Sequence, residues 1–365
     1  MKIKISFLLF TFLFMSCASI QEYEGSNFEK LPPLTAKVIS EPVQFDTDDP
    51  AIWINEEDPS KSLIIGTDKE VGGGIYAFDL EGKIQKSITE MDRPNNVDVA
   101  YGLKIGNRKV DIAVTTERMS HRLRVFSLPD LKVLDHGGFP MFRDETVSEF
   151  REVMGISLYT DPEKGDIYAI VGRKAGPLDN YLEQYLLSDD GDGGVKATLV
   201  RKFGKFSSVK EIEPIAVVNE LGYVYYSDEL FGIRKYYAHP DSGNTELAVF
   251  GKDDFARDME GISIYKVSDE TGYIIVSDQQ VNHFNIYPRE GSSGNPHAHN
   301  LIKSIELSTS SSDGNEVTSR GLNENFPCGL FVAMSEEKTF HYYSWSDMAG
   351  DELFCAPDGG GTSHK

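Results

Sequence analysis

The chain has 365 residues, with 58 Asp and Glu against 36 Lys and Arg, which gives a formal charge of -22. A protein this acidic cannot bind nucleic acid or an anionic membrane by bulk attraction, because both depend on Lys and Arg neutralising phosphate. Since 40% of its residues are hydrophobic, the composition is that of an ordinary globular protein.

The first residues predict an export signal. An apolar run at residues 5–15 follows two lysines and is too short to span a membrane. The run stops just before Cys17, as in bacterial lipoproteins, whose cysteine is acylated after cleavage. We expect a signal peptide at residues 1–16, a flexible lipid-anchored tether at 17–36, and an exported lipoprotein, periplasmic or on the cell surface, that meets the membrane only through its anchor. The alternative is plain signal cleavage beside an incidental cysteine.

The body of the chain, residues 37–350, repeats a unit of two short β-rich runs joined by a polar turn. The first runs lie at residues 50–53, 97–100, 155–159, 214–217, 261–265 and 329–332. The second runs lie at residues 62–66, 110–114, 167–171, 223–226, 273–276 and 339–343. Six units that begin 47 to 68 residues apart predict an all-β fold, a six-bladed β-propeller, with a tail at 351–365. A two-sheet sandwich is the alternative.

In a propeller the first strands line the central channel, so the residues just before them form a ring at one mouth. That ring is predicted to hold Asp49, Asn96, Met154, Glu213, Glu260 and Cys328, with Asp48, Asp98 and Asp258 close by. Carboxylates that converge on one axis repel one another unless a cation neutralises them. Hard oxygen ligands of this kind suit calcium.

The residues at the ends of the second strands reach the same mouth and are sorted by charge. The first three units place cations there, Lys69, Arg118, Arg173 and Lys174. The next two units place acidic or amide groups there, Asp228, Glu229, Asp278 and Gln279. One half of the rim is therefore expected to be basic and the other half acidic, which favours a metal-dependent function.

Several other sites lack support. The sequence has no Gly-rich phosphate loop ending in Lys-Ser or Lys-Thr, no G-x-S-x-G elbow, no H-E-x-x-H and no covalent phosphatase motif. His297 and His299 could chelate a soft metal, but a solvated loop is the simpler interpretation. Cys328 and Cys355 are the cysteines beyond the lipid site, and the sequence leaves open whether they pair.

Two segments carry a family resemblance. Residues 46–53 (DTDDPAIW) and 95–101 (NNVDVAY) resemble the two signature segments of the β-propeller phytases, which are secreted, calcium-dependent phosphatases with six blades. The likeness extends over residues 38–349. The resemblance implies that this chain is a monomeric phosphoric monoester hydrolase of the 3-phytase type. Its expected substrate is the calcium complex of phytate, myo-inositol hexakisphosphate, from which water activated by metal releases phosphate without a phosphoenzyme.

The same resemblance implies roles for individual residues. Several calcium ions are expected on Asp48, Asp49, Asn96, Asp98, Glu213, Asp228 or Glu229, Asp258, Glu260, Gln279 and Asp313. Lys69, Arg118 and Glu213 are the expected catalytic residues. Lys69 and Arg118, together with Arg173 and Lys174, are expected to bind the substrate. The chain departs from the family at Met154, where a Tyr is usual, and at Pro214, where a Gly is usual.

Two other functions remain open from the sequence. A non-catalytic propeller that captures a phosphorylated or carbohydrate ligand would keep the basic half of the rim but not the metal ligands. A calcium-dependent propeller lactonase or esterase would keep the metal ligands but has no need of the basic half. The presence of both halves favours the phosphatase.

Overall fold

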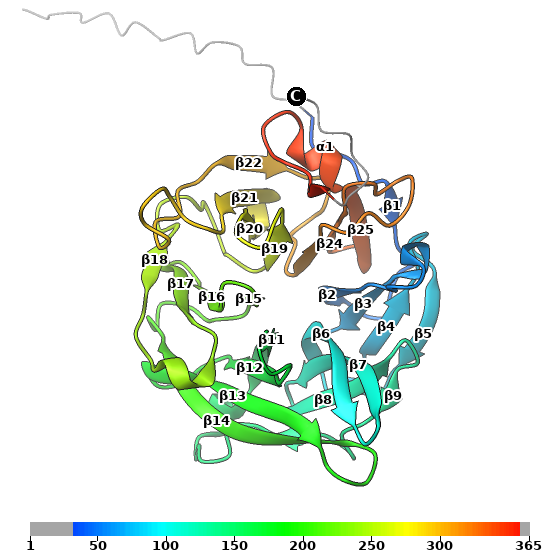
Figure 1. Cartoon of the computed structure of the whole chain (residues 1–365), viewed down its shortest axis with the longest axis vertical. Helices are drawn as coiled ribbons and strands as arrows, with labels where there is room; N and C mark the ends of the chain where they lie inside the picture. Colours follow the sequence, from blue (N-terminus) through cyan, green and yellow to red (C-terminus); the bar gives the residue numbers. More distant parts are fainter. Residues whose placement is uncertain (1–31, 358–365) are drawn as a thin grey trace, which may run out of the picture. The chain divides into compact units, whose positions relative to one another are not determined.

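The described part of the chain, residues 32–357 of the computed structural model, folds into six antiparallel β-sheets set around a central channel (Figure 1). Runs rich in Val, Ile, Tyr and Phe form the strands, and turns containing Gly, Asp and Asn separate them. The predicted all-β, six-bladed β-propeller is thus confirmed. Within residues 32–357, no helix has the length and apolar character needed to cross a bilayer.

Each blade is one sheet whose strands follow one another from the channel outward. Blade 1 contains β2 (Thr47–Trp53), β3 (Leu63–Asp68), β4 (Gly74–Phe78) and β5 (Ile84–Ile88). Blade 2 contains β6 (Pro94–Ile105), β7 (Arg108–Glu117), β8 (Arg122–Leu128), β9 (Lys132–Val133) and β10 (Phe139–Pro140). Blade 3 contains β11 (Val153–Thr160), β12 (Ile167–Arg173), β13 (Asp179–Asp189) and β14 (Val195–Lys205).

The remaining blades follow the same plan. Blade 4 contains β15 (Ile215–Val218), β16 (Tyr223–Asp228), β17 (Gly232–Tyr237) and β18 (Ala248–Phe250). Blade 5 contains β19 (Ile262–Lys266), β20 (Gly272–Asp278), β21 (His283–Pro288) and β22 (Lys303–Glu306). Blade 6 contains β23 (Asn315–Thr318), β24 (Leu330–Ser335), β25 (Thr339–Ser344) and β1 (Val38–Ile39). Short 3-10 helices lie at Pro59–Lys61, Ser148–Arg151, Pro240–Ser242 and Gln279–Val281, and α1 (Trp345–Ala349) follows β25.

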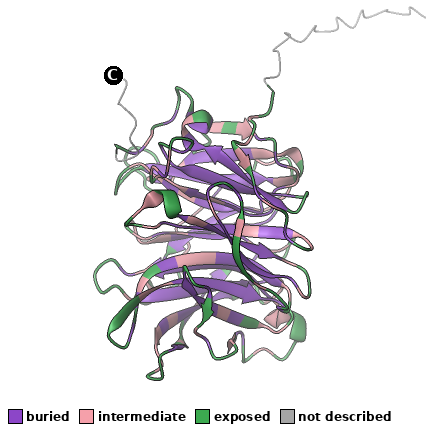
Figure 2. Ribbon diagram, turned by 90° about the vertical axis from the view of Figure 1, so that its right-hand side faces the viewer, coloured by how far each residue is buried: buried purple, intermediate pink, exposed green. Residues whose placement is uncertain are grey.

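Hydrophobic packing occurs between blades rather than inside them. Six buried clusters each join the facing sheets of two neighbouring blades, and the cluster between blades 6 and 1 closes the ring. The middle strands are therefore buried on both faces, as Figure 2 shows for the strands that cross the molecule. Because no blade can bury its faces alone, the six blades stabilise one another.

The sixth blade corrects the predicted register. The run at 329–332 is not its inner strand but lies in its second strand, β24, and β23 lies inside it. The position equivalent to the ring residues is therefore Asp313, ahead of β23, and not Cys328. The outermost strand comes from the other end of the chain, because Val38 of β1 pairs with Tyr342 of β25. The sequence pattern missed β23 because its four residues include a single hydrophobic one, Val317, whereas the equally short β15 is apolar throughout.

The ends of the described region are tied to the propeller. Cys328 and Cys355 form a disulfide, which answers the question that the sequence left open. The backbone N–H of Ala356 donates to the Tyr265 hydroxyl at 3.0 Å, so the first residues of the predicted tail are packed. At the other end Leu34 pairs with Leu307, inside the predicted tether. The predicted signal peptide and Cys17 lie outside the described residues.

The histidine loop differs from its predicted solvated state at one position. His299 is 5% exposed, and its Nδ1 lies 2.7 Å from the Pro288 carbonyl oxygen. Its Nε2 lies 3.2 Å from the Nζ of Lys235, which also sits 3.8 Å from the ring centroid of Tyr223. Burial lowers the pKa of Lys235 to about 7 and that of His299 to about 4. The pair is part of the packing between blades 4 and 5.

Candidate functional site

The channel mouth at which the inner strands begin collects the chemistry-bearing residues. A pocket of about 180 Å³ lies there, and it is lined by Asp48, Lys69, Arg93, Asn95, Arg118, Met154, Lys174, Glu211, Glu213, Glu260 and Asp313. All six blades contribute to this lining. All six blades reach the pocket from residues just before or early in the first strand, and blades 1 to 3 also reach it from the residue just after the second strand.

A repeated local rule explains which side chain enters the pocket. The last residue of a second strand turns away and holds the loop that leads to the inner strand. Asp68 accepts hydrogen bonds from the backbone N–H groups of residues 45 and 46, and Asp278 accepts them from those of residues 256 and 257. Asp228 likewise accepts from the backbone and hydroxyl of Ser207. Because side chains alternate along a strand, the next residue points the other way, toward the channel axis.

This rule separates the adjacent pairs that the sequence could not separate. Asp228 is buried and pairs with Arg234 at 2.8 Å, whereas Glu229 joins the mouth. Arg173 is 2% exposed and donates to three backbone carbonyls, those of Tyr181, Asn180 and Phe150. It also pairs with Glu145 at 2.6 Å, so the structure places it in a loop support and not among the pocket residues.

Lys174, the residue after Arg173, does line the pocket. Its Nζ lies 2.6 Å from Glu211 Oε2. Glu211 was not among the predicted site residues, although it stands two positions before Glu213 in the same loop. The signal that could have found it is the Glu-Ile-Glu spacing, since alternate residues of an extended segment face the same side.

Lys69 is surrounded by carboxylates. Its Nζ contacts Asp313, lies 3.4 Å from Asp48 Oδ1 and lies 3.6 Å from Asp46 Oδ2. Burial alone would lower the pKa of Lys69, but the charges of Asp48 and Asp313 raise it above its ordinary value. Lys69 is therefore a fixed positive charge at the boundary between the basic and acidic halves.

Arg118 completes the basic side. It is 5% exposed and its backbone N–H donates to the Arg93 carbonyl at 2.9 Å. Its guanidinium contacts the thioether sulfur of Met154, and its Nε is buried without a hydrogen-bond partner. A thioether is a weak acceptor, so the guanidinium keeps donors free for an oxygen-rich ligand. Arg93 also lines the pocket and was not predicted.

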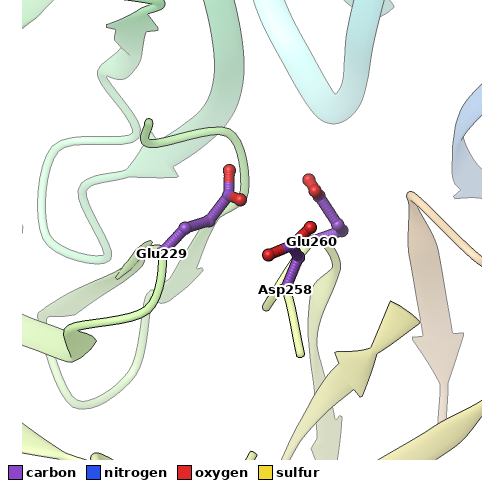
Figure 3. A group of neighbouring side chains, drawn as sticks. All are labelled: Glu229, Asp258 and Glu260. Atoms are coloured by element: carbon purple, nitrogen blue, oxygen red, sulfur yellow. The ribbon is translucent and has the colours of Figure 1, made fainter. Parts of the chain in front are cut away.

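The acidic side is built by blades 4 and 5. Glu229 follows β16, and Asp258 and Glu260 precede β19, with one oxygen of each lying within 4.8 Å of the others. Figure 3 shows the three carboxylates turned toward one another from two separate segments. Lys210 approaches all three, at 2.5 Å from Glu229, 2.8 Å from Asp258 and 3.4 Å from Glu260. Gln279 contacts Asp313, which connects this side to the Lys69 group.

Burial and mutual repulsion disfavour the charged forms of these acids. Burial, and then the charges of Asp48 and Glu260, raise the pKa of Glu213 well above its ordinary value. Burial also raises the pKa of Glu229 to about 8, although Lys210 opposes the rise. Burial raises the pKa of Asp313 to about 6. The mouth therefore gathers more negative charge than the described protein groups around it offset.

Three predicted ligands lie inside the channel rather than in the mouth pocket. Asp49, Asn96 and Asp98 line a separate cavity of about 160 Å³ together with Glu316 of β23. Asp98 accepts hydrogen bonds from the Leu158 backbone at 2.7 Å and the Ser157 hydroxyl at 3.1 Å. Burial raises the pKa of Asp98 to about 6 and, with the charge of Asp98, that of Glu316 to about 8.

The donor set fits a hard cation. Glu229 Oε1 and the amide oxygens of Asn95 and Asn96 are buried without a hydrogen-bond partner. Buried oxygens of this kind are costly unless something coordinates them. Carboxylate and amide oxygens are the ligands that calcium prefers, and a cation would also relieve the repulsion among the acids.

The fold and this mouth define the class of the protein: a six-bladed β-propeller whose channel opens between a carboxylate-rich half and a Lys and Arg half. The family model for phytases matches residues 2–342. A 3-phytase of Bacillus subtilis (strain 168) is 31% identical over 325 residues, which cover 83% of this chain and 80% of that protein. The chain belongs to the phytase family, and the resemblance seen in its sequence is confirmed.

A structural relative supports the fold alone. A solved luciferin-regenerating enzyme shares 12% sequence identity with a TM-score of 0.51, and the alignment covers 87% of this chain and 98% of that one. At this identity the likeness concerns the blades and their order around the channel, and it carries no information on the chemistry at the mouth.

Proposed function

We propose that this member of the phytase family is a calcium-dependent phosphatase that removes phosphate from phytate. The proposal is carried by one observation, the opposition of Lys69, Arg118 and Lys174 to the acids Glu213, Glu229 and Glu260 at one channel mouth. A polyphosphate is repelled by a protein of charge -22 unless cations gather at its binding site. The mouth has Lys and Arg on one side and, on the other, a group of carboxylates able to hold a metal ion.

The chain's own residues divide the work of binding and orientation. Lys69 and Arg118 donate to the oxygens of the phosphate that is cleaved, and their fixed positions favour the charge that develops there. Lys174, which is 38% exposed, is placed to hold a neighbouring phosphate of the same substrate. Arg173 supports this edge of the pocket by fixing the loop between β12 and β13.

Calcium would be held at the mouth by Glu213, Glu229, Asp258, Glu260, Asp313 and Asp48, with Asp49 and Asn96 available in the channel below. When bound, it supplies Lewis acidity toward phosphate oxygens and lowers the pKa of water. Glu213 stands between the basic and acidic halves, where its carboxylate can orient the attacking water or accept its proton.

The proposal is tested by phosphate release. The mature protein, stripped of metal with a chelator, should release inorganic phosphate from phytate only after calcium is restored. Arg118→Gln and Glu213→Gln should each lower kcat/KM by about 100-fold or more, as the loss of one preorganised group in a buried site does. Their metal-free thermal unfolding should stay close to that of the parent protein.

Other outcomes of these assays would favour a different function. Absence of phosphate release at neutral pH with calcium present would refute the phosphatase. Binding of phytate without turnover would favour the non-catalytic propeller, and turnover of lactones in place of phytate would favour the lactonase. We also propose, from the sequence, that the mature protein is exported and anchored through Cys17, which radiolabelled fatty-acid incorporation lost in Cys17→Ser would test.

A further inference from the structure

Lys210 has no role in the predicted site, yet it occupies the centre of the acidic half. Its Nζ lies within 3.4 Å of one oxygen from each of Glu229, Asp258 and Glu260. These are the same three residues whose oxygens converge closely enough to hold a metal ion. An ammonium group has three N–H donors, one for each of the three carboxylates.

An ammonium and a calcium ion cannot share this position. Calcium requires oxygens at about 2.3–2.6 Å, so an ion bound to these carboxylates would fill the space now taken by Lys210 Nζ. The ammonium also leaves one oxygen of the acid group unpaired, because Glu229 Oε1 remains buried without a hydrogen-bond partner. The carboxylates are thus partly neutralised but not fully coordinated.

Lys210 is also free to leave. Its side chain is 33% exposed and sits in the loop between β14 and β15. Within residues 32–357, its Nζ forms ion pairs with these three carboxylates. A flexible four-carbon stem with a solvent path can move its charge outward without breaking other packing.

We propose that Lys210 is an internal competitor for the cation site formed by Glu229, Asp258 and Glu260. In the metal-free protein its ammonium takes the cation's place and limits repulsion among the acids; calcium binding displaces it into the mouth. This inference rests on the proposed cation site but not on turnover. Lys210 therefore sets the calcium concentration at which the site fills, and it moves a positive charge toward the substrate only when the ion is bound.

Calcium affinity measured by isothermal titration on metal-stripped protein tests the proposal. If Lys210 occupies the site in nine of ten molecules or more, the apparent affinity is reduced about tenfold or more. Lys210→Met should therefore bind calcium at one site at least about tenfold more tightly than the parent protein. Lys210→Arg, which keeps the charge, should stay within about threefold of the parent.

Lys205→Met is the matched control, because Lys205 is exposed in the same chain segment at the end of β14. It makes the same change of charge and should leave the affinity unchanged. Raising the salt to about 0.5 M should preserve the effect of Lys210→Met, since contact competition is screened less than long-range attraction. Unchanged or weaker calcium binding by Lys210→Met, or tight binding by Lys210→Arg as well, would overturn the proposal.

A measurement on the parent protein avoids dependence on variant folding. Competitive acetylation read by mass spectrometry should label Lys210 at least about threefold faster with calcium than without, while Lys205 labels equally in both. Slower or unchanged labelling of Lys210 would contradict displacement. Phytate hydrolysis assayed on the same samples separates the two proposals: labelling that responds to calcium without turnover refutes only the phosphatase, and turnover without any change at Lys210 refutes only the competitor.

Discussion

Glu316 offers the sharpest test of how the channel treats negative charge. It lies on β23, its Oε1 accepts a hydrogen bond from the Val317 backbone at 2.7 Å, and it shares the channel cavity with Asp49 and Asp98. Burial and the charge of Asp98 raise its pKa from 4.5 to about 8. The change to make is Glu316→Gln, which keeps the shape and removes the ionisation.

The sign and size of the effect follow from the two pKa values. Below pH 4.5 the carboxyl is protonated in both the folded and unfolded chains, so its ionisation does not change the free energy of unfolding. Between pH 4.5 and about 8 the unfolded chain releases the proton while the folded chain retains it, so stability falls by about 1.4 kcal/mol per pH unit. The upper bound is about 5 kcal/mol, and because the side chain is partly exposed to the channel, solvent should reduce the loss to about 1–3 kcal/mol.

The assay is urea unfolding of metal-stripped protein followed by circular dichroism from pH 5 to 9. Glu316→Gln should unfold at nearly the same urea concentration as the parent at pH 5 and become progressively more stable than the parent up to pH 8, with no further gain above it. Glu56→Gln, an exposed carboxylate at the other end of the channel, is the control and should run parallel to the parent. A constant difference between Glu316→Gln and the parent across this range would refute the reasoning.

Further changes test residues whose positions depend on the tertiary fold. Arg173→Met should lower the free energy of unfolding by about 3–5 kcal/mol, because it leaves buried carbonyls and a carboxylate unpaired. Lys174→Met should instead raise KM for phytate with little change in Tm. Equal losses of Tm in the two variants would contradict a structural role for Arg173 and a binding role for Lys174. Reducing the Cys328–Cys355 bond, which joins residues with a sequence separation of 27, should lower the free energy of unfolding by about 3 kcal/mol in the urea assay. An unchanged urea midpoint would show that the bond does not stabilise the fold. Lys235→Met should remove a pH dependence of stability. As pH rises from about 7 to about 10, the parent protein should gain stability relative to this variant, because Lys235 stays protonated only in the unfolded chain over this range. A stability difference that does not change with pH would exclude the lowered pKa of Lys235.

The repeat itself was readable from the sequence. Six pairs of short β-rich runs with polar turns predicted the blades, because each blade must bury both faces of its middle strands and therefore needs the same local pattern. The register of those repeats also predicted that Asp48, Lys69, Arg118 and Glu213 lie at one mouth. Local periodicity determines these features, since strand direction and alternation are properties of the nearby chain.

Other assignments needed contacts between distant segments. The sixth blade combines β1 with β23 to β25, and its inner strand is too polar to stand out in the sequence. The predicted ring residue there, Cys328, instead forms a disulfide, and Asp313 takes the equivalent place. Ring closure pairs Val38 with Tyr342, residues from opposite ends of the described chain, so no local sequence pattern can predict it.

The sequence by itself determined the number of blades, the mouth at which function gathers and the division of that mouth into basic and acidic halves. Only the tertiary structure decided which member of each adjacent pair faces the mouth. It places Lys174 in the pocket and Glu229 in the acid group, while Arg173 and Asp228 support loops. It also brought Lys210, from the loop that leads into blade 4, into contact with acids of blades 4 and 5. The physical reason is that charge and strand order follow from the local sequence, whereas the partner of a charged side chain depends on which segments the fold brings beside it.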